Sequence, residues 1–130
     1  MPKSGDQYTI TLKETHLDWG NHRYTATRDI IYDEGYIPIP KDKAVAFEIY
    51  NVNESRANNI YTFSTADKFF TDEQLKASGC SEAGDRYAKQ FHGNGNLKLL
   101  GSWFTNCSAK VGDTITVTFT GPNSLILKHN

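Results

Sequence analysis

The stretch Tyr36–Lys41 reads Tyr-Ile-Pro-Ile-Pro-Lys and is followed by an apolar segment up to Ile49. Pro38 and Pro40 have no amide hydrogen, so this stretch cannot be a fully paired central strand of a sheet. Proline is, however, well tolerated in the first turn of a helix. Beyond Pro40, the apolar side chains are spaced for one face of about two helical turns. The stretch therefore predicts a strand that stops at a proline and passes directly into a short helix.

Short segments rich in β-branched and aromatic residues occur along the rest of the chain, as is typical of strands. We predict strands at residues 8–12, 30–32, 60–64, 87–91, 97–100, 114–119 and 125–127. Residues 71–75 predict a capped helical turn, because Thr71 is followed by two acidic residues. Residues from Gly101 to about Cys107 predict a second short helix. Many short strands with two short helices indicate a mainly β domain, either a barrel or a sandwich with helices at its ends.

The composition fits one globular domain of 130 residues, with 38% hydrophobic and 22% charged residues. The sequence contains no run of 18 apolar residues, so we expect no transmembrane helix. The first six residues have no apolar signal region, which favours a cytoplasmic protein. Cys80 and Cys107 are too few for a disulfide scaffold, and we expect two reduced thiols.

Charge is distributed unevenly between the two halves of the sequence. Residues 1–85 contain nine basic and fourteen acidic residues, whereas residues 86–130 contain five basic residues and one acidic residue. Such asymmetry is a recognised indication of a polyanionic partner.

A search for catalytic motifs favours a domain without catalysis. The chain contains neither a glycine-rich phosphate loop nor a nucleophile elbow. His16 and His22 are six residues apart in an irregular segment, a spacing that matches no helical metal pair. Cys107 is more easily explained as a buried structural thiol than as a nucleophile. We therefore expect no catalytic residue, no metal and no cofactor.

Two segments carry side chains suited to binding a ligand. Residues 14–34 form a long irregular loop, and long ordered loops are usually functional. Its candidate binding residues are Asn21, His22, Arg23, Tyr24 and Arg28. The second segment has no acidic residue, and its candidates are Lys89, Gln90, His92, Asn94, Asn96 and Lys98. Gly93 and Gly95 would let the backbone approach a ligand closely.

These side chains suit DNA, because arginine and asparagine bind base edges while lysine and hydroxyl groups bind phosphates. The same side chains would also suit a sugar, with aromatic rings that stack on it and amides that bind its hydroxyls. Each of these features also has a structural explanation. Tyr24 would pack in the core, and Arg23 and Arg28 would pair with neighbouring acidic residues. Gly93 and Gly95 would form an ordinary turn. Taken together, the two segments favour binding.

Two parts of the sequence resemble the B3-like DNA-binding pseudobarrel family. Tyr36–Lys41, with Ala44 and Phe47 behind it, is similar to the family's element of a strand, Ile-Pro-Lys and a helix. Gly101–Phe104 followed by Val111–Phe119 is similar to its second helix and closing hairpin, although the spacing of glycine, tryptophan and phenylalanine departs from the family pattern. The matching parts occur in the family's order and cover about a third of the chain.

The resemblance implies a seven-stranded open pseudobarrel with two short end helices. It also implies that two arms grip double-stranded DNA in the major groove. One arm, about residues 14–34, would lie between the first two strands, and the other, about residues 86–98, between the fourth and fifth. The sequence Gly35–Pro40 looks more like the branch of the family that serves as recognition domains of some bacterial restriction endonucleases. In these enzymes, a separate nuclease domain or subunit cuts the DNA.

The sequence therefore predicts sequence-specific binding of double-stranded DNA by a single domain, residues 1–130, without catalysis of its own. A carbohydrate-binding β-domain that uses loop aromatics is the alternative, and a small accessory protein that binds another protein is a third possibility. Acidic residues within 29–34 would have to face away from the phosphates.

Overall fold

The computed structural model describes residues 2–13, 16, 35–51, 59–79, 86–96 and 98–130 of the chain. These residues form one sheet of seven strands and two helices. The strands are β1 (Gln7–Thr11), β2 (Ile37–Pro38), β3 (Ile60–Thr65), β4 (Glu73–Ser78), β5 (Gln90–Gly93), β6 (Thr114–Gly121) and β7 (Ser124–His129). The helices are α3 (Lys41–Ala46) and α4 (Leu99–Asn106).

The sheet has the strand order β1-β6-β7-β3-β4-β5-β2. All neighbouring strands are antiparallel except β3 and β7, which run parallel. Alternate side chains of β1 and β6, such as Ile10 and Val117, are buried, and the residues between them are more exposed. This alternation is the pattern expected of strands with one buried face, because successive side chains of a strand point to opposite faces.

The two edge strands, β1 and β2, approach each other, so the sheet is curled into a nearly closed barrel. The hydroxyl of Tyr8 in β1 donates a hydrogen bond of 3.1 Å to the carbonyl oxygen of Pro38 in β2. Burial, followed by the nearby Tyr61, raises the pKa of Tyr8 well above 10.0, so its hydroxyl remains a donor. The position of β2 at an edge also explains how a strand can end in proline, since an edge strand has one unpaired side.

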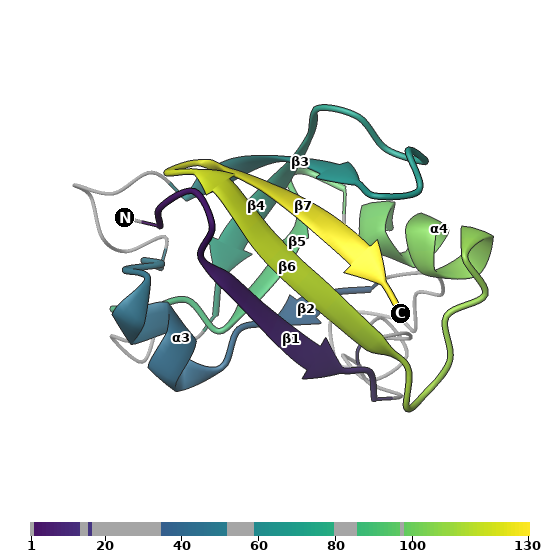
Figure 1. Cartoon of the computed structure of the whole chain (residues 1–130), viewed down its shortest axis with the longest axis horizontal. Helices are drawn as coiled ribbons and strands as arrows, with labels where there is room; N and C mark the ends of the chain where they lie inside the picture. Colours follow the sequence, from purple (N-terminus) through teal and green to yellow (C-terminus); the bar gives the residue numbers. More distant parts are fainter. Residues whose placement is uncertain (1, 14–15, 17–34, 52–58, 80–85, 97) are drawn as a thin grey trace, which may run out of the picture.

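The two helices lie at opposite ends of the barrel (Figure 1). Helix α3 begins directly after Pro40, as predicted, and places Ala44 in the core. It ends at Ala46, earlier than the predicted apolar face, and Glu48 then adopts a positive φ of 55°. At the other end, α4 buries Leu100, Trp103 and Phe104. The mainly β barrel with two end helices confirms the predicted fold class.

Three local predictions were wrong. Residues 71–75 do not form a helical turn, because β4 begins at Glu73 and pairs with strands on both sides. The described residues 98–100 of the strand predicted at 97–100 do not form a strand, since Lys98 caps α4 and the helix begins at Leu99. The strand predicted at 87–91 is shifted to β5, and Tyr87 forms only an isolated bridge with Tyr50. The strand predicted at 30–32 lies outside the described residues.

Neither helix in the described part of the chain has the length and hydrophobicity needed to cross a bilayer.

Candidate nucleic-acid interface

The candidate residues of the second segment do not belong to one arm. Lys89 precedes β5, Gln90 and His92 are on it, and the turn between β5 and α4 contains Asn94, Asn96 and Lys98. A strand rises about 3.3 Å per residue, so Lys89 and Asn94 are separated by roughly 16 Å along β5. The predicted bounds of the second arm, 86–98, were therefore wrong: the connection between β4 and β5 is residues 79–89.

The register of β4 and β5 gathers polar side chains on the outside of the barrel. Lys76 is paired with His92, and Ser78 is paired with Gln90. Their neighbours Leu75, Ala77, Phe91 and Gly93 are buried, so these four and Gln74 point outward. We call Gln74, Lys76, Ser78, Gln90 and His92 the outer β4–β5 face. It contains amides, a hydroxyl, an imidazole and an ammonium group, and none of its five residues is acidic.

His92 is held in a defined orientation on this face. Its Nδ1 lies 3.0 Å from the carbonyl oxygen of Gly93, and its Nε2 lies 2.8 Å from the hydroxyl of Ser78. A carbonyl oxygen can only accept, so Nδ1 donates; in the neutral ring, Nε2 therefore accepts from Ser78. The ring is fixed between two neighbouring strands, which restricts its rotation in advance of any binding event.

The turn after β5 uses its asparagines to fix its own shape. The side-chain amide of Asn94 donates to the side-chain oxygen of Gln74 at 3.0 Å, and the side-chain oxygen of Asn96 accepts from the backbone of Lys98 at 3.1 Å. Gly95 has a positive φ of 74°, which favours glycine. All four residues from Asn94 to Lys98 that the structure describes are exposed. The turn is thus both a structural element and part of the accessible surface.

The predicted binding residues of the first loop, Asn21, His22, Arg23, Tyr24 and Arg28, lie outside the described residues. The two ends of this loop are described, and they meet. The carbonyl oxygen of His16 accepts from the backbone N–H of Tyr36 at 3.1 Å, and the two rings are in edge contact at 5.0 Å. Gly35 packs so closely on α4 that an added Cβ would lie 3.0 Å from the ring of Phe104. The first loop therefore leaves and re-enters the barrel at the α4 end.

The connection between β4 and β5 begins and ends at the opposite end of the barrel. Lys89 donates its backbone N–H to Ser78 at 2.9 Å and accepts from Ile39, just before α3, at 2.8 Å. The outer β4–β5 face consequently lies between the root of one loop at the α4 end and the root of the other loop at the α3 end. The length of the face, set by β4 and β5, is comparable to the roughly 12 Å width of a DNA major groove.

His16 gives the root of the first loop a dependence on pH. The ring is only 7% exposed, and its Nδ1 accepts a hydrogen bond of 3.1 Å from the backbone N–H of Lys13. Burial, followed by the positive charge of Lys13, lowers the pKa of His16 below the usual 6.5. Protonation would also remove the acceptor that Lys13 uses.

We expect acid to destabilise the fold through His16. Since its pKa is lower in the folded chain than in the unfolded chain, its contribution is complete above pH 6.5 and is lost as the pH falls through the folded value. Urea unfolding of the wild type and of His16→Asn at about pH 7.5 and about pH 5 measures this loss. Asparagine retains an acceptor and does not titrate, so the variant should lose less stability in acid. Equal losses of stability in the wild type and in His16→Asn would show that protonation of His16 is not the cause of the acid destabilisation.

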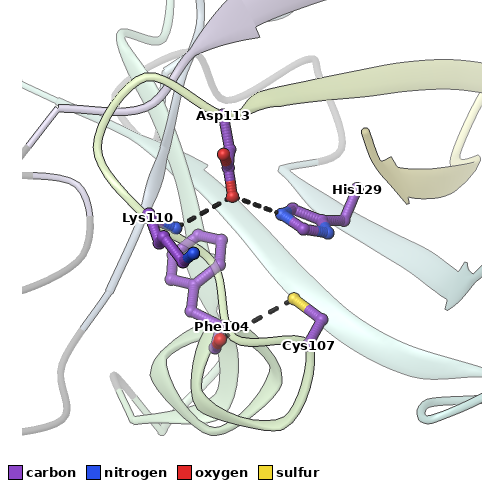
Figure 2. Close-up of polar contacts among 5 residues, drawn as sticks. All are labelled: Phe104, Cys107, Lys110, Asp113 and His129. Atoms are coloured by element: carbon purple, nitrogen blue, oxygen red, sulfur yellow. Dashed lines mark hydrogen bonds and ion pairs between the residues drawn. The ribbon is translucent and has the colours of Figure 1, made fainter.

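Cys107 does not have the environment of a nucleophile (Figure 2). Its half-buried thiol donates to the carbonyl oxygen of Phe104 at 3.7 Å, and burial, followed by the charge of Asp67, raises its pKa. Reactive cysteines instead have lowered pKa values. The nearby Asp113 carboxylate accepts from His129 at 2.8 Å and from the backbone of Lys110 at 3.0 Å, and the hydrogen bond from His129 is the main reason that its pKa is lowered. Cys107 is a free thiol, as predicted, whereas Cys80 lies outside the described residues.

No group of three or more His, Cys, Asp and Glu side chains suited to a metal ion occurs in the described ranges. No protein-family model and no curated protein matches this chain.

Sequence reasoning missed the contribution of β4 to this surface. Residues 71–75 were predicted to form a helical turn, so the position of Lys76 beside β5 was not predicted. The alternation of Gln74, Leu75, Lys76, Ala77 and Ser78 was the available signal for a strand.

Proposed function

We propose that this domain binds double-stranded DNA in a sequence-specific manner and has no catalytic activity of its own. The observation that supports this proposal best is the position of the outer β4–β5 face between the roots of two loops. A face without acidic side chains can lie along phosphates, while loops at its two ends reach the neighbouring base edges. The resemblance of Tyr36–Lys41 to the pseudobarrel family supports the same function.

Within this proposal, the candidate residues have different roles. Lys76, Lys89 and Lys98 would contact phosphates, which gives affinity for any sequence. Gln90 and the first-loop residues, Arg23 above all, would contact bases. In the finer form of the proposal, the chain is the recognition domain of a cytoplasmic restriction-type system, and a separate domain or subunit supplies the nuclease.

Selection from a random duplex library tests the proposal directly. We expect enrichment of one short motif, with affinity that falls as salt is raised. A library without enrichment, together with no retardation of duplex DNA at low salt, would refute it. Salt-insensitive binding to a glycan array would support the carbohydrate-binding alternative instead.

Replacing Lys76 by alanine should weaken binding to all duplexes by a similar factor. The lost phosphate contact should reduce the slope of log affinity against log salt by about 0.9. Fluorescence anisotropy with the selected duplex and a scrambled duplex, over a range of salt concentrations, measures both effects. Lys128→Ala is the matched control, because Lys128 is an exposed lysine on β7, which β3 separates from β4.

If Lys128→Ala changes the slope as much as Lys76→Ala does, the outer β4–β5 face is not the DNA contact surface.

Gln90→Ala tests the proposed contact with a base instead of a phosphate. Loss of a base contact should cost about 1–3 kcal/mol on the selected duplex and much less on the scrambled one.

A further inference from the structure

A pocket of about 340 Å³ lies beside α3, at the α3 end of the barrel. It is lined by Ile39, Lys41, Ala44, Arg86, Tyr87, Ala88 and Lys89. Its volume is at the lower end of the range for small-molecule sites, so it suits one small ligand rather than an oligomer.

The floor of the pocket is apolar and its walls are fixed. Ile39, Ala44 and Ala88 are all at least 95% buried. Segment 86–89 is hydrogen-bonded on several sides: Ile39 donates to Lys89 at 2.8 Å, Ala88 donates to Ile49 at 2.9 Å, and Asn51 donates to Arg86 at 2.8 Å. These bonds join α3, its flanking segments and segment 86–89 into one unit, so the pocket is formed before any ligand arrives.

Three cationic side chains line the opening of this pocket. Lys41, Arg86 and Lys89 are all exposed residues, and none of the lining residues that the structure describes is acidic. The carboxylate of Glu48 lies close enough to interact with the charge of Arg86. Phosphate groups are the common ligands of such arginine and lysine clusters.

Aromatic stacking positions Arg86. The rings of Tyr50 and Tyr87 are stacked, with centroids 5.4 Å apart and planes inclined by 21°. The Arg86 guanidinium carbon lies 5.1 Å from the Tyr50 centroid and 5.8 Å from the Tyr87 centroid. The pocket therefore combines one aromatic lining residue, Tyr87, with an apolar floor and a positioned guanidinium group.

From this combination we propose that the pocket binds a nucleoside monophosphate unit. The planar base occupies the apolar floor beside Tyr87, and the phosphate is bound by Lys41 and Arg86. The unit has two possible sources, a free nucleotide and the 5′-phosphorylated end of a DNA strand, and both present the same ring and phosphate. This inference stands on the pocket alone and does not require that duplex DNA lies on the outer β4–β5 face.

Calorimetric titration of the full chain with AMP and TMP, and separately with adenosine and inorganic phosphate, tests the proposal. We expect the nucleotides to bind at least about tenfold more tightly than either part alone, because both halves of the pocket contribute. Lys41→Ala should weaken nucleotide binding by about tenfold, the usual loss for a charge-assisted hydrogen bond. Arg86→Ala should weaken it by a similar factor, and Lys128→Ala is the matched control that should leave it unchanged.

Lys41 is an exposed side chain with no part in the core, so we expect Lys41→Ala to fold even if Arg86→Ala does not. Thermal melting of both variants checks this. A 5′-phosphorylated short single strand and its unphosphorylated counterpart distinguish the two sources. Absence of nucleotide and 5′-phosphate binding by the wild type, or binding that Lys41→Ala leaves unchanged, overturns the proposal. The affinity of the same wild-type sample for duplex DNA is measured as well. A failure of nucleotide binding at the pocket is thereby distinguished from a failure of the proposed DNA binding.

Discussion

Replacement of Trp103 by alanine is expected to lower the free energy of unfolding by about 3–5 kcal/mol. Trp103 is fully buried in α4 and packs beside Phe104, with ring centroids 5.7 Å apart. It is among the largest completely buried side chains of the described core, so alanine would leave a cavity that the hydrogen-bonded barrel cannot collapse to fill. A domain of this size has only about 5–15 kcal/mol of stability, and the loss is therefore a large fraction of it.

Trp103→Phe separates the packing of the ring from its hydrogen bond. The indole N–H donates to the Asp67 carboxylate at 2.9 Å and thereby ties α4 to the turn after β3. Burial raises the pKa of Asp67, but hydrogen bonds from Thr65, Phe69 and Trp103 outweigh it and lower the value below 3.8. The phenylalanine variant should lose about 0.5–1.5 kcal/mol for the hydrogen bond, in addition to a smaller packing loss than alanine causes.

Urea unfolding followed by tyrosine fluorescence and circular dichroism measures both losses at neutral pH. The contribution of Asp67 is present above the unfolded pKa of 3.8 and disappears as the pH falls through the lower folded value. A loss below about 1 kcal/mol for Trp103→Ala would show that α4 does not close the barrel end as described.

The fold could be predicted where local pattern and tertiary environment agree. The strands predicted at 114–119 and 125–127 depend on neighbouring residues alone, and β6 and β7 confirm both of them. The prolines at 38 and 40 likewise indicated an edge strand followed by a helix. At β4, local and tertiary signals conflict. Thr71 with two acidic residues resembles a helix cap, but pairing with β3 on one side and β5 on the other determines the structure.

The candidate site could be predicted by residue type but not by position. Lys89 and Asn94 are five residues apart, and only the structure shows that β5 lies between them and separates them to opposite ends of the barrel. The pairing of Lys76 with His92 depends on strand register, which local sequence does not specify. The roots of the first loop converge through a hydrogen bond between His16 and Tyr36, which are twenty residues apart.

Gly93→Ala is expected to destabilise the fold by about 3 kcal/mol, the upper end of the usual cost of overpacking. An added Cβ would lie 2.0 Å from the carbonyl oxygen of Asn96 and 2.7 Å from the Cβ of Leu99. The first of these atoms belongs to the backbone and cannot move without opening the turn. The sequence suggested that Gly93 permits close approach of a ligand, whereas the structure shows close approach of its own chain.

Gly95→Ala is the matched control, two residues away in the same turn. An added Cβ there meets no atom within 4 Å, so the only cost is the positive φ of 74°, about 1 kcal/mol for a non-glycine residue. Urea unfolding without DNA should therefore rank Gly93→Ala well below Gly95→Ala in stability. If Gly93→Ala instead unfolds like the wild type and loses only duplex affinity, the glycine serves the ligand and not the turn. The turn would then be a direct DNA contact, and α4 would begin correctly without the tight packing of Gly93 against Leu99.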